Sequence, residues 1–166
     1  MSHAELAALA DRAAALEALF RDIAGRRMAG VPVLNPALRV EAVGFAPHAP
    51  EPGLTEGGDG ILITPWFMNL VRLPLAREDD VTRTGASRSL AVGRERFDFI
   101  GAHEPAFGSF EACSLFSPVF EFADHAAARA TADAVLASLR VAPAAVPEPP
   151  AQPARRGFLF GRGGAT

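Results

Sequence analysis

The clearest pattern of hydrophobic and polar positions lies in the first 25 residues of the chain. Ser2 and Glu5 have the spacing of a capping box, which satisfies two free backbone N–H groups where a helix begins. Apolar residues then recur at alternating steps of three and four, the spacing of one helix face: Leu6, Leu9, Ala13, Leu16, Phe20 and Ile23. We predict a helix that ends near Gly25 and docks by this stripe on its own domain. Binding of a partner by the stripe is the alternative.

Alternating apolar and polar positions in the middle of the chain predict short β-strands. The candidates are residues 38–45, 89–92, 96–100 and 110–116. Residues 46–59 are rich in Pro and Gly, and residues 76–85 are rich in charge, so both are predicted loops.

Residues 60–74, G-I-L-I-T-P-W-F-M-N-L-V-R-L-P, form an almost continuous apolar run with a Thr-Pro step inside it. Strands accept proline only at edges, at their first position and at bulges. We therefore predict a buried strand whose pairing breaks at Thr64 and Pro65 and resumes over residues 66–73. Arg72 is a charge within this run, and the face of the strand that it occupies is left open.

A second helix is predicted from Asp124, a suitable N-cap, to Arg140. Its apolar face consists of Ala128, Ala132, Val135, Leu136 and Leu139. Five prolines between residues 143 and 153 then indicate a linker that joins neither a helix nor a sheet. The predicted fold is α+β: a mostly antiparallel sheet, flanked by an N-terminal and a C-terminal helix that cover one face. Residues 1–142 form one domain, and residues 143–166 form a Pro-rich tail.

The composition narrows the functional classes. A chain of 166 residues with 49% hydrophobic residues fits one folded domain, and a net charge of -3 argues against a nucleic-acid partner. The single cysteine, Cys113, excludes an internal disulfide framework. The apolar runs are shorter than the roughly 20 residues of a membrane span, and residues 1–25 lack the pattern of a secretory signal. A cytoplasmic location is expected.

The chemistry-bearing residues do not form a recognisable catalytic pattern. The four histidines have no His or Cys partner at metal-ligand spacing, so no metal and no cofactor is expected. Ser114 lacks the G-x-S-x-G context of a nucleophile elbow. We therefore predict that the protein is not an enzyme. The alternative is a small hydrolase that uses Ser114 or Cys113, with His103 and Glu104 as base and orienting group for Cys113.

Two strand segments are candidates for binding a peptide. Each places polar residues and a proline inside an apolar stretch, where freed backbone groups could pair with an incoming chain. The alternative is that both are core strands bent by proline. The candidate residues are Thr64, Pro65, Trp66, Phe67, Met68 and Asn69 in the first segment and Ser114, Leu115, Phe116, Ser117 and Pro118 in the second.

The tail carries a further motif. Residues 155–159, R-R-G-F-L, resemble the R-R-x-F-L core of a twin-arginine export signal, but they lie at the wrong end of the chain for that role. An apolar cluster on a proline-rich arm is typical of a docking motif. A tail that folds back on the sheet or stays unstructured is the alternative. The tail motif consists of Arg155, Arg156, Phe158, Leu159 and Phe160.

Three segments together resemble the HybE/HupJ family of accessory chaperones for nickel–iron hydrogenase assembly. They are residues 60–74, residues 114–122 (S-L-F-S-P-V-F-E-F) and residues 155–162 (R-R-G-F-L-F-G-R). The resemblance implies a cytoplasmic, non-catalytic chaperone that engages the hydrogenase small-subunit precursor, the large subunit or both, together with other maturation factors. It also implies that export of the small subunit is held back until assembly is complete. Some members carry a rubredoxin domain with C-x-x-C pairs, which this chain lacks.

This resemblance leads to a hypothesis for binding. The two candidate segments lie close together and bind a client segment by backbone pairing and apolar contact. Because the tail motif resembles the client's export signal, it occupies the same site as a tethered pseudo-substrate until client displaces it. The alternative function is a structural subunit that stays in the mature hydrogenase.

Overall fold

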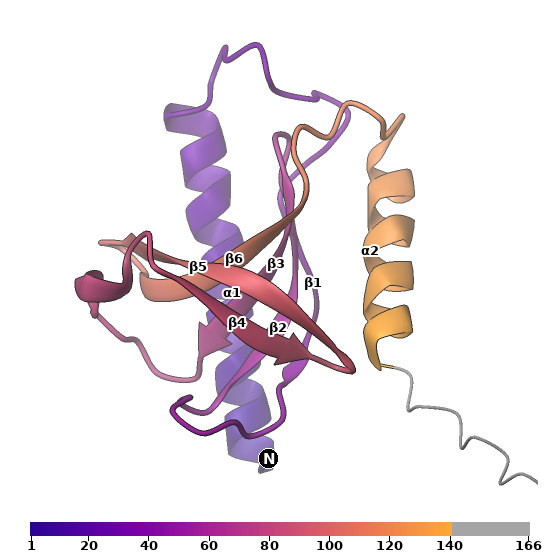
Figure 1. Ribbon diagram of the computed structural model, residues 1–166. Helices are drawn as coiled ribbons and strands as arrows, with labels where there is room; N and C mark the ends of the chain where they lie inside the picture. The colour runs from indigo at the N-terminus through magenta and orange to yellow at the C-terminus, as the bar shows by residue number, and fades with distance from the viewer. Residues whose placement is uncertain (141–166) are drawn as a thin grey trace, which may run out of the picture.

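The computed structural model describes residues 1–140 and confirms an α+β fold with an antiparallel sheet between an N-terminal and a C-terminal helix (Figure 1). The six strands are ordered β1-β2-β3-β6-β5-β4. The predicted domain boundary at residue 142 and the tail motif lie outside the described residues. The elements are α1 (His3–Arg26), β1 (Glu41–Pro47), β2 (Gly57–Ile63), β3 (Met68–Pro74), a 3-10 turn (Val81–Arg83), β4 (Ser87–Val92), β5 (Glu95–Glu104), β6 (Gly108–Phe116) and α2 (His125–Arg140).

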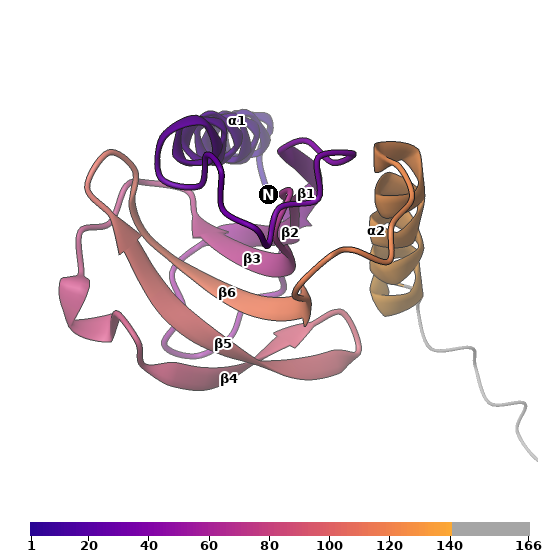
Figure 2. The same cartoon turned by 90° about the horizontal axis from the view of Figure 1, so that it is seen from above.

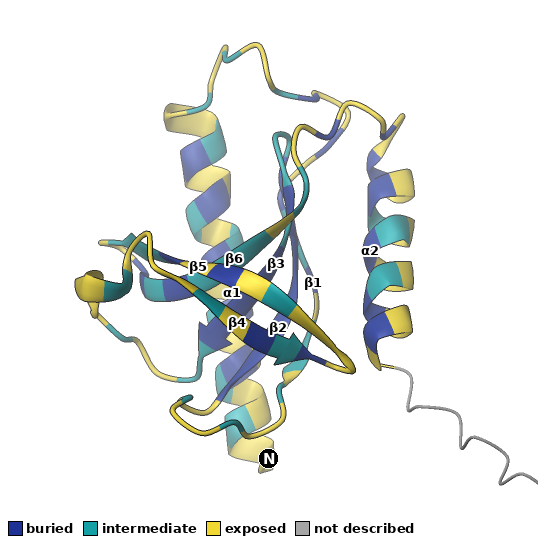
Figure 3. Ribbon diagram, in the orientation of Figure 1, coloured by how far each residue is buried: buried dark blue, intermediate teal, exposed yellow. Residues whose placement is uncertain are grey.

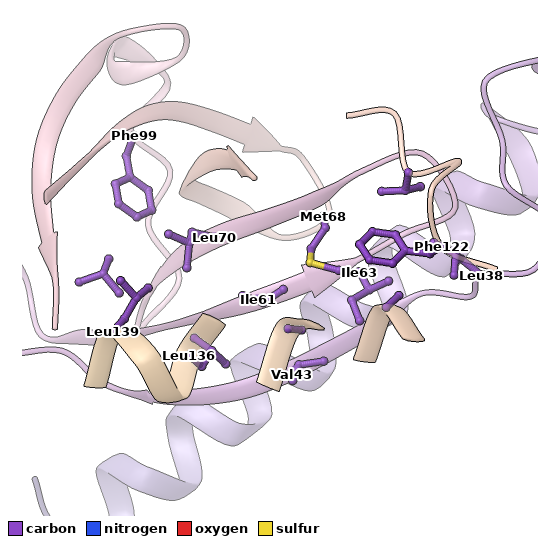
Figure 4. Close-up of a cluster of buried hydrophobic side chains, with 14 of the residues drawn as sticks. Leu38, Val43, Ile61, Ile63, Met68, Leu70, Phe99, Phe122, Leu136 and Leu139 are labelled. Carbon is purple, nitrogen blue, oxygen red and sulfur yellow. The ribbon is translucent and has the colours of Figure 1, made fainter. Parts of the chain in front are cut away.

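The two helices cover opposite faces of the sheet, so the expectation that they share one face is wrong (Figure 2). Successive side chains of a strand point to opposite faces, and both faces of β2 are apolar. Strand β2 is buried along its whole length (Figure 3). Ile61 and Ile63 join the cluster beneath α2 (Figure 4), whereas Leu62 joins the cluster beneath α1. A central strand with two apolar faces needs a cover on each side.

Helix α1 begins with the predicted capping box, in which Ser2 Oγ accepts the Glu5 N–H and Glu5 accepts the Ser2 N–H. Its stripe is buried against the sheet except for Leu6, which is 44% exposed. The helix lies so close to β2 that a Cβ on Gly58 would stand 2.4 Å from Leu9 Cδ2. The stripe therefore docks on its own domain, as predicted.

Residues 60–74 form a β-hairpin, so the prediction of one interrupted strand is wrong. Strands β2 and β3 pair in continuous register from Gly57↔Pro74 to Ile63↔Met68. Pro65 and Trp66 stand at the tip of the connection, where proline removes no ladder hydrogen bond. Strand β2 also begins inside the predicted loop 46–59, because its first residues, two glycines and Asp59, look like a turn in the sequence.

Polar contacts hold both ends of helix α2 to the sheet. Asp124 is its N-cap as predicted, with Oδ1 accepting the Ala127 N–H at 2.8 Å. Glu41 on β1 contacts His125 Nε2 at 2.8 Å and Arg129 Nη1 at 2.6 Å. Partial burial raises the pKa of the Glu41 carboxyl, but the hydrogen bonds and charges of these two partners outweigh burial and leave the pKa below its ordinary value. The first turns of α2 therefore stay against β1.

A buried ion network holds the other end of α2. Arg72 on β3 is 5% exposed, and its Nη2 lies 3.1 Å from Asp59 Oδ2, directly opposite on β2. Arg140, the last residue of α2, donates to Asp59 Oδ1 at 3.1 Å and to the Gly44 carbonyl at 2.7 Å. The charge that the sequence left unassigned thus faces α2.

The same arginine shows how strongly the sheet curls. Arg72 Nη2 donates to the Ala91 carbonyl of β4 at 2.6 Å, although β6 and β5 lie between β3 and β4 in the sheet. In a flat sheet, strands three places apart are about 14 Å from each other. The outer strands therefore bend toward α2, and Phe99 of β5 closes over the guanidinium, whose Cζ is 5.6 Å from the ring centroid.

Replacing Asp59 by Ala is expected to lower the free energy of unfolding by about 3 kcal/mol, because it removes the nearest carboxylate from the buried Arg72 charge and leaves only Glu51, at 3.9 Å. Urea denaturation followed by circular dichroism measures the change. The matched control is Asp133→Ala, which removes an exposed carboxylate paired with Arg129 and should cost less than about 1 kcal/mol. Equal losses for the two variants would contradict a structural role for the buried network.

Candidate functional site

The structure brings the two predicted peptide-binding segments together. Strands β3 and β6 are antiparallel neighbours, with Met68 opposite Phe116 and Asn69 opposite Ser114. The turn at residues 64–67 and the segment at residues 117–118 therefore lie at the same end of the central strands. We call this end of the sheet the hairpin end.

The backbone around Pro65 is not free to pair with another chain, contrary to the expectation from the sequence. Thr64 is fully buried and closes the turn: its N–H donates to the Phe67 carbonyl at 2.9 Å, and its Oγ1 accepts the N–H groups of Trp66 and Phe67. The Pro65 carbonyl accepts the Asn35 N–H at 2.7 Å. The tight turn satisfies these groups internally.

Asn35 was not a predicted site residue, yet it joins the two segments. Beyond its backbone contact with Pro65, its side-chain amide donates to the carbonyls of Val119 and Phe122 at 3.0 and 2.9 Å. Its Oδ1 accepts the Ala37 N–H at 3.0 Å, and the residue is 7% exposed. The Asn-Pro step at residues 35–36 is a turn signal, but its partners lie far away in the sequence.

Two half-buried aromatic side chains extend the hairpin end toward α1. Phe67 meets Phe20 edge-on at 5.7 Å between ring centroids, and Trp66 meets Phe67 at 5.4 Å. Met68, in contrast, is fully buried on the α2 side of the sheet. Trp66 and Phe67 thus combine a packed side with a solvent-facing side, whereas Thr64 and Met68 can only position their neighbours.

Asn69 and Ser114 form a polar pair beside these aromatic side chains. Asn69 is half-buried, Ser114 is exposed, and the two face each other across β3 and β6. Asn69 Oδ1 is buried and has no hydrogen-bond partner among the described residues. A buried acceptor without a donor is costly. Asn69 is therefore a candidate for accepting a hydrogen bond from a ligand once its amide group turns outward.

The remaining predicted residues surround the point where β6 leaves the sheet. Phe116 is half-buried and meets Phe122 edge-on at 5.3 Å between ring centroids. Ser117 and Pro118, joined by a cis peptide bond, are exposed. These three residues border the second feature of the site, a split in the sheet.

Strands β5 and β6 separate beyond residues 100 and 112. Strand β6 continues to the hairpin end, whereas β5 and its turn to β4 run to the C-terminal end of α2, where the Arg94 N–H donates to the Leu139 carbonyl at 3.2 Å. Strands β5 and β6 pair from Glu104↔Gly108 only as far as Ile100↔Ala112, although β5 reaches back to Glu95 and β6 continues to Phe116. Both views show the β4–β5 hairpin diverging from β6 on the side of α2 (Figures 1 and 2). Within the described chain, residues 95–99 pair only with β4, and residues 113–116 only with β3.

A shallow, open groove of about 450 Å³ lies between this split and α2. Leu115 is the one predicted site residue in it. The other lining residues come from β5 and α2, which are far apart in the sequence, so no local pattern predicts that they share a groove. The groove, here called the β5–β6 groove, is lined by Glu95, Phe97, Leu115, Thr131, Ala134, Val135, Ser138 and Leu139.

The groups considered for hydrolysis are not arranged as a base and a nucleophile. Burial, with a smaller contribution from Asp98, raises the pKa of the Cys113 thiol, which disfavours the thiolate. His103 Nε2 lies 3.2 Å from Asp79 Oδ1, and His103 pairs with Ser109, four residues from Cys113 on β6. Across residues 1–140, no three His, Cys, Asp or Glu side chains are grouped as metal ligands, and no helix is long and apolar enough to cross a membrane.

Most of the chain is similar in sequence to known proteins. A family model described as "[NiFe]-hydrogenase assembly, chaperone, HybE" matches residues 11–161. Protein HoxT of Cupriavidus necator is 51% identical over 92% of this chain and 89% of its own length. The hydrogenase expression/formation protein HupJ of Bradyrhizobium diazoefficiens is 42% identical over 72% of this chain and 66% of its own length. The solution structure of HybE from Escherichia coli shares the fold, with a TM-score of 0.55, 22% identity and coverage of 93% and 91% of the two chains.

Replacing Asn35 by Ala is expected to destabilise the hairpin end by at least about 2 kcal/mol, because two buried carbonyls lose their donor. Asn69→Ala is the matched control: it removes a side-chain acceptor without a described partner, so the free energy of unfolding should change by less than about 1 kcal/mol. Chemical denaturation measures both changes. If Asn69→Ala lowers the free energy of unfolding more than Asn35→Ala does, the structural role belongs to Asn69 and not to Asn35.

Proposed function

Because the chain belongs to the HybE family of nickel–iron hydrogenase assembly chaperones, we propose that it binds hydrogenase subunit precursors during maturation. The family match over residues 11–161 confirms the resemblance to this family, and it spans residues 60–74, 114–122 and all but the last residue of 155–162. The chaperone acts without catalysing a reaction, and the metals of the active site belong to the client.

The hairpin end is the surface that we assign to the client. The observation that carries this assignment is the pairing of Asn69 with Ser114, which brings both candidate segments to one surface. Trp66 and Phe67 supply apolar contact area, and Asn69 Oδ1 supplies an unused acceptor. Pro65, Ser117 and Pro118 border the same surface, while Thr64 and Met68 hold it in place. Leu115 and Phe116 lie at the same end of the sheet but pack on its α2 side.

The client is the hydrogenase small-subunit precursor with its twin-arginine signal, the large subunit, or both. Binding takes place in the cytoplasm, together with other maturation factors, and prevents premature export. The alternative is a structural subunit retained in the mature enzyme. The two functions differ in one observable: a structural subunit co-purifies with exported, processed hydrogenase, whereas a chaperone co-purifies only with precursor.

Binding of small-subunit precursor, with and without its signal peptide, tests the chaperone function. We expect a complex with the signal-bearing form and a change in the fluorescence of Trp66, the only tryptophan in the chain. Calorimetry and fluorescence titration measure the two effects. Binding that ignores the signal peptide would point to the mature fold, and binding only to large subunit would point to that client. Failure to bind either subunit would sink the proposal.

Asn69→Ala is expected to weaken precursor binding about tenfold, the effect of losing one hydrogen bond worth about 1.4 kcal/mol in a desolvated contact. Its stability should stay close to that of the unmodified protein. Ser87→Ala is the matched control, because it removes an exposed polar side chain from β4, outside the hairpin end. If the two variants bind precursor with equal affinity, Asn69 is not part of the binding surface.

A further inference from the structure

The β5–β6 groove has two properties of a site for an extended peptide. The first is the split itself, because residues 95–99 and 113–116 each have one strand neighbour among the described residues and a free side toward the groove. A free strand side can pair with the backbone of an added strand. The second is a set of half-buried apolar side chains, Phe97, Leu115 and Val135.

We propose that residues 155–160 of the same chain, R-R-G-F-L-F, bind in this groove as an extended segment. Side chains of an extended segment alternate between two faces. Phe158 and Phe160 therefore share one face, which contacts Phe97, Leu115 and Val135, while Leu159 points the other way. The apolar cluster of the tail and the apolar lining of the groove thereby cover each other.

The chain leaves the described fold at the right place for this contact. Leu139 lines the groove, and Arg140 follows it as the last residue of α2. Fourteen residues separate Arg140 from Arg155, enough to span up to about 46 Å when extended. Helix α2, with 16 residues, is only about 24 Å long. The linker can therefore return the motif to any point along the groove.

The lining of the groove carries one acidic charge that can pair with the basic start of the motif. The motif begins with Arg155 and Arg156, whereas Glu95 is the charged residue in the lining of the groove. No Lys or Arg belongs to that lining. Because only fourteen residues join the motif to the fold, the effective concentration of the motif at the groove is high, on the order of millimolar, so weak contacts suffice to keep the groove occupied.

The consequence for the chaperone rests on the proposed function. A tail that occupies the groove competes with a client segment that has the same R-R-x-F-L pattern and reaches from the hairpin end across Leu115. An occupied groove lowers the apparent client affinity in proportion to the fraction of free sites. The tail thus shields apolar side chains until a matching client displaces it.

Intramolecular docking is tested on the full-length chain by paramagnetic NMR. A nitroxide is attached to Ala137→Cys, an exposed position on α2 outside the groove lining, in a Cys113→Ala background. We expect broadening of the amide signals of residues 156–160. The matched control carries the label on Asp22→Cys of α1, on the opposite face of the sheet, and should leave these signals sharp. Unbroadened signals with both labels would overturn the proposal.

A mixture of labelled protein and isotope-enriched unlabelled protein separates this arrangement from exchange between molecules. Broadening in the mixture would assign the groove to the tail of a second copy and overturn the intramolecular form. Hydrogen exchange gives an independent measure: Phe158→Ser with Phe160→Ser should speed exchange at residues 96–99 and 113–116 about tenfold, as for a groove occupied nine-tenths of the time. The control is Ala151→Ser with Ala154→Ser, in the linker, which should leave the exchange rates at these residues unchanged.

The double Phe variant also separates this proposal from the chaperone function. We expect it to bind signal-bearing precursor up to about tenfold more tightly than the unmodified chain. Unchanged or weaker binding would show that the tail is no competitor, even where NMR places it in the groove. If precursor binds neither form while the NMR contact is present, the proposed function fails and the intramolecular contact stands.

Discussion

The buried charge network of Arg72, Asp59 and Arg140 is the constraint on which this structure depends. A charged side chain at 5% exposure is tolerated only with a partner and hydrogen bonds. Arg72 on β3 therefore contacts Asp59 on β2 and the Ala91 carbonyl on β4, and Asp59 in turn contacts Arg140 at the end of α2. The network therefore links the curl of the sheet to the position of the C-terminal end of α2, beside the groove.

The same arrangement separates two kinds of binding surface. Strands β3 and β6 are central, and the turn at residues 64–67 satisfies its own backbone, so the hairpin end offers mainly side chains. The split between β5 and β6 is different, because each strand there keeps a side without a strand neighbour in the described chain. Helix α2 is held at one end by Glu41 and at the other by Asp59, which leaves the groove between them open. Side-chain recognition and backbone pairing are thus available next to each other.

Local signals predicted the elements well wherever the determining contacts lie within a few residues. The capping box of Ser2 and Glu5, the N-cap Asp124 and the apolar stripes of both helices could be read directly. The hairpin was missed because a run with apolar residues on both faces looks like one buried strand, and the Gly-rich start of β2 looks like a loop. The opposite placement of the helices was missed for a related reason: periodicity shows that a helix has an apolar face but not which side of a sheet it covers.

The candidate site likewise combines features that the sequence predicts with features that only the tertiary structure sets. The sequence by itself determined the family, the α+β class and the two unusual Pro-containing segments, because each depends on residue identity and short spacing. Tertiary structure alone decided that Asn69 faces Ser114, that Asn35 joins residues 65 and 119–122, and that Phe97 and Val135 share a groove with Leu115. Those relations depend on strand register and on the path of the chain between distant elements. Both arise from packing the whole core, which no local pattern encodes.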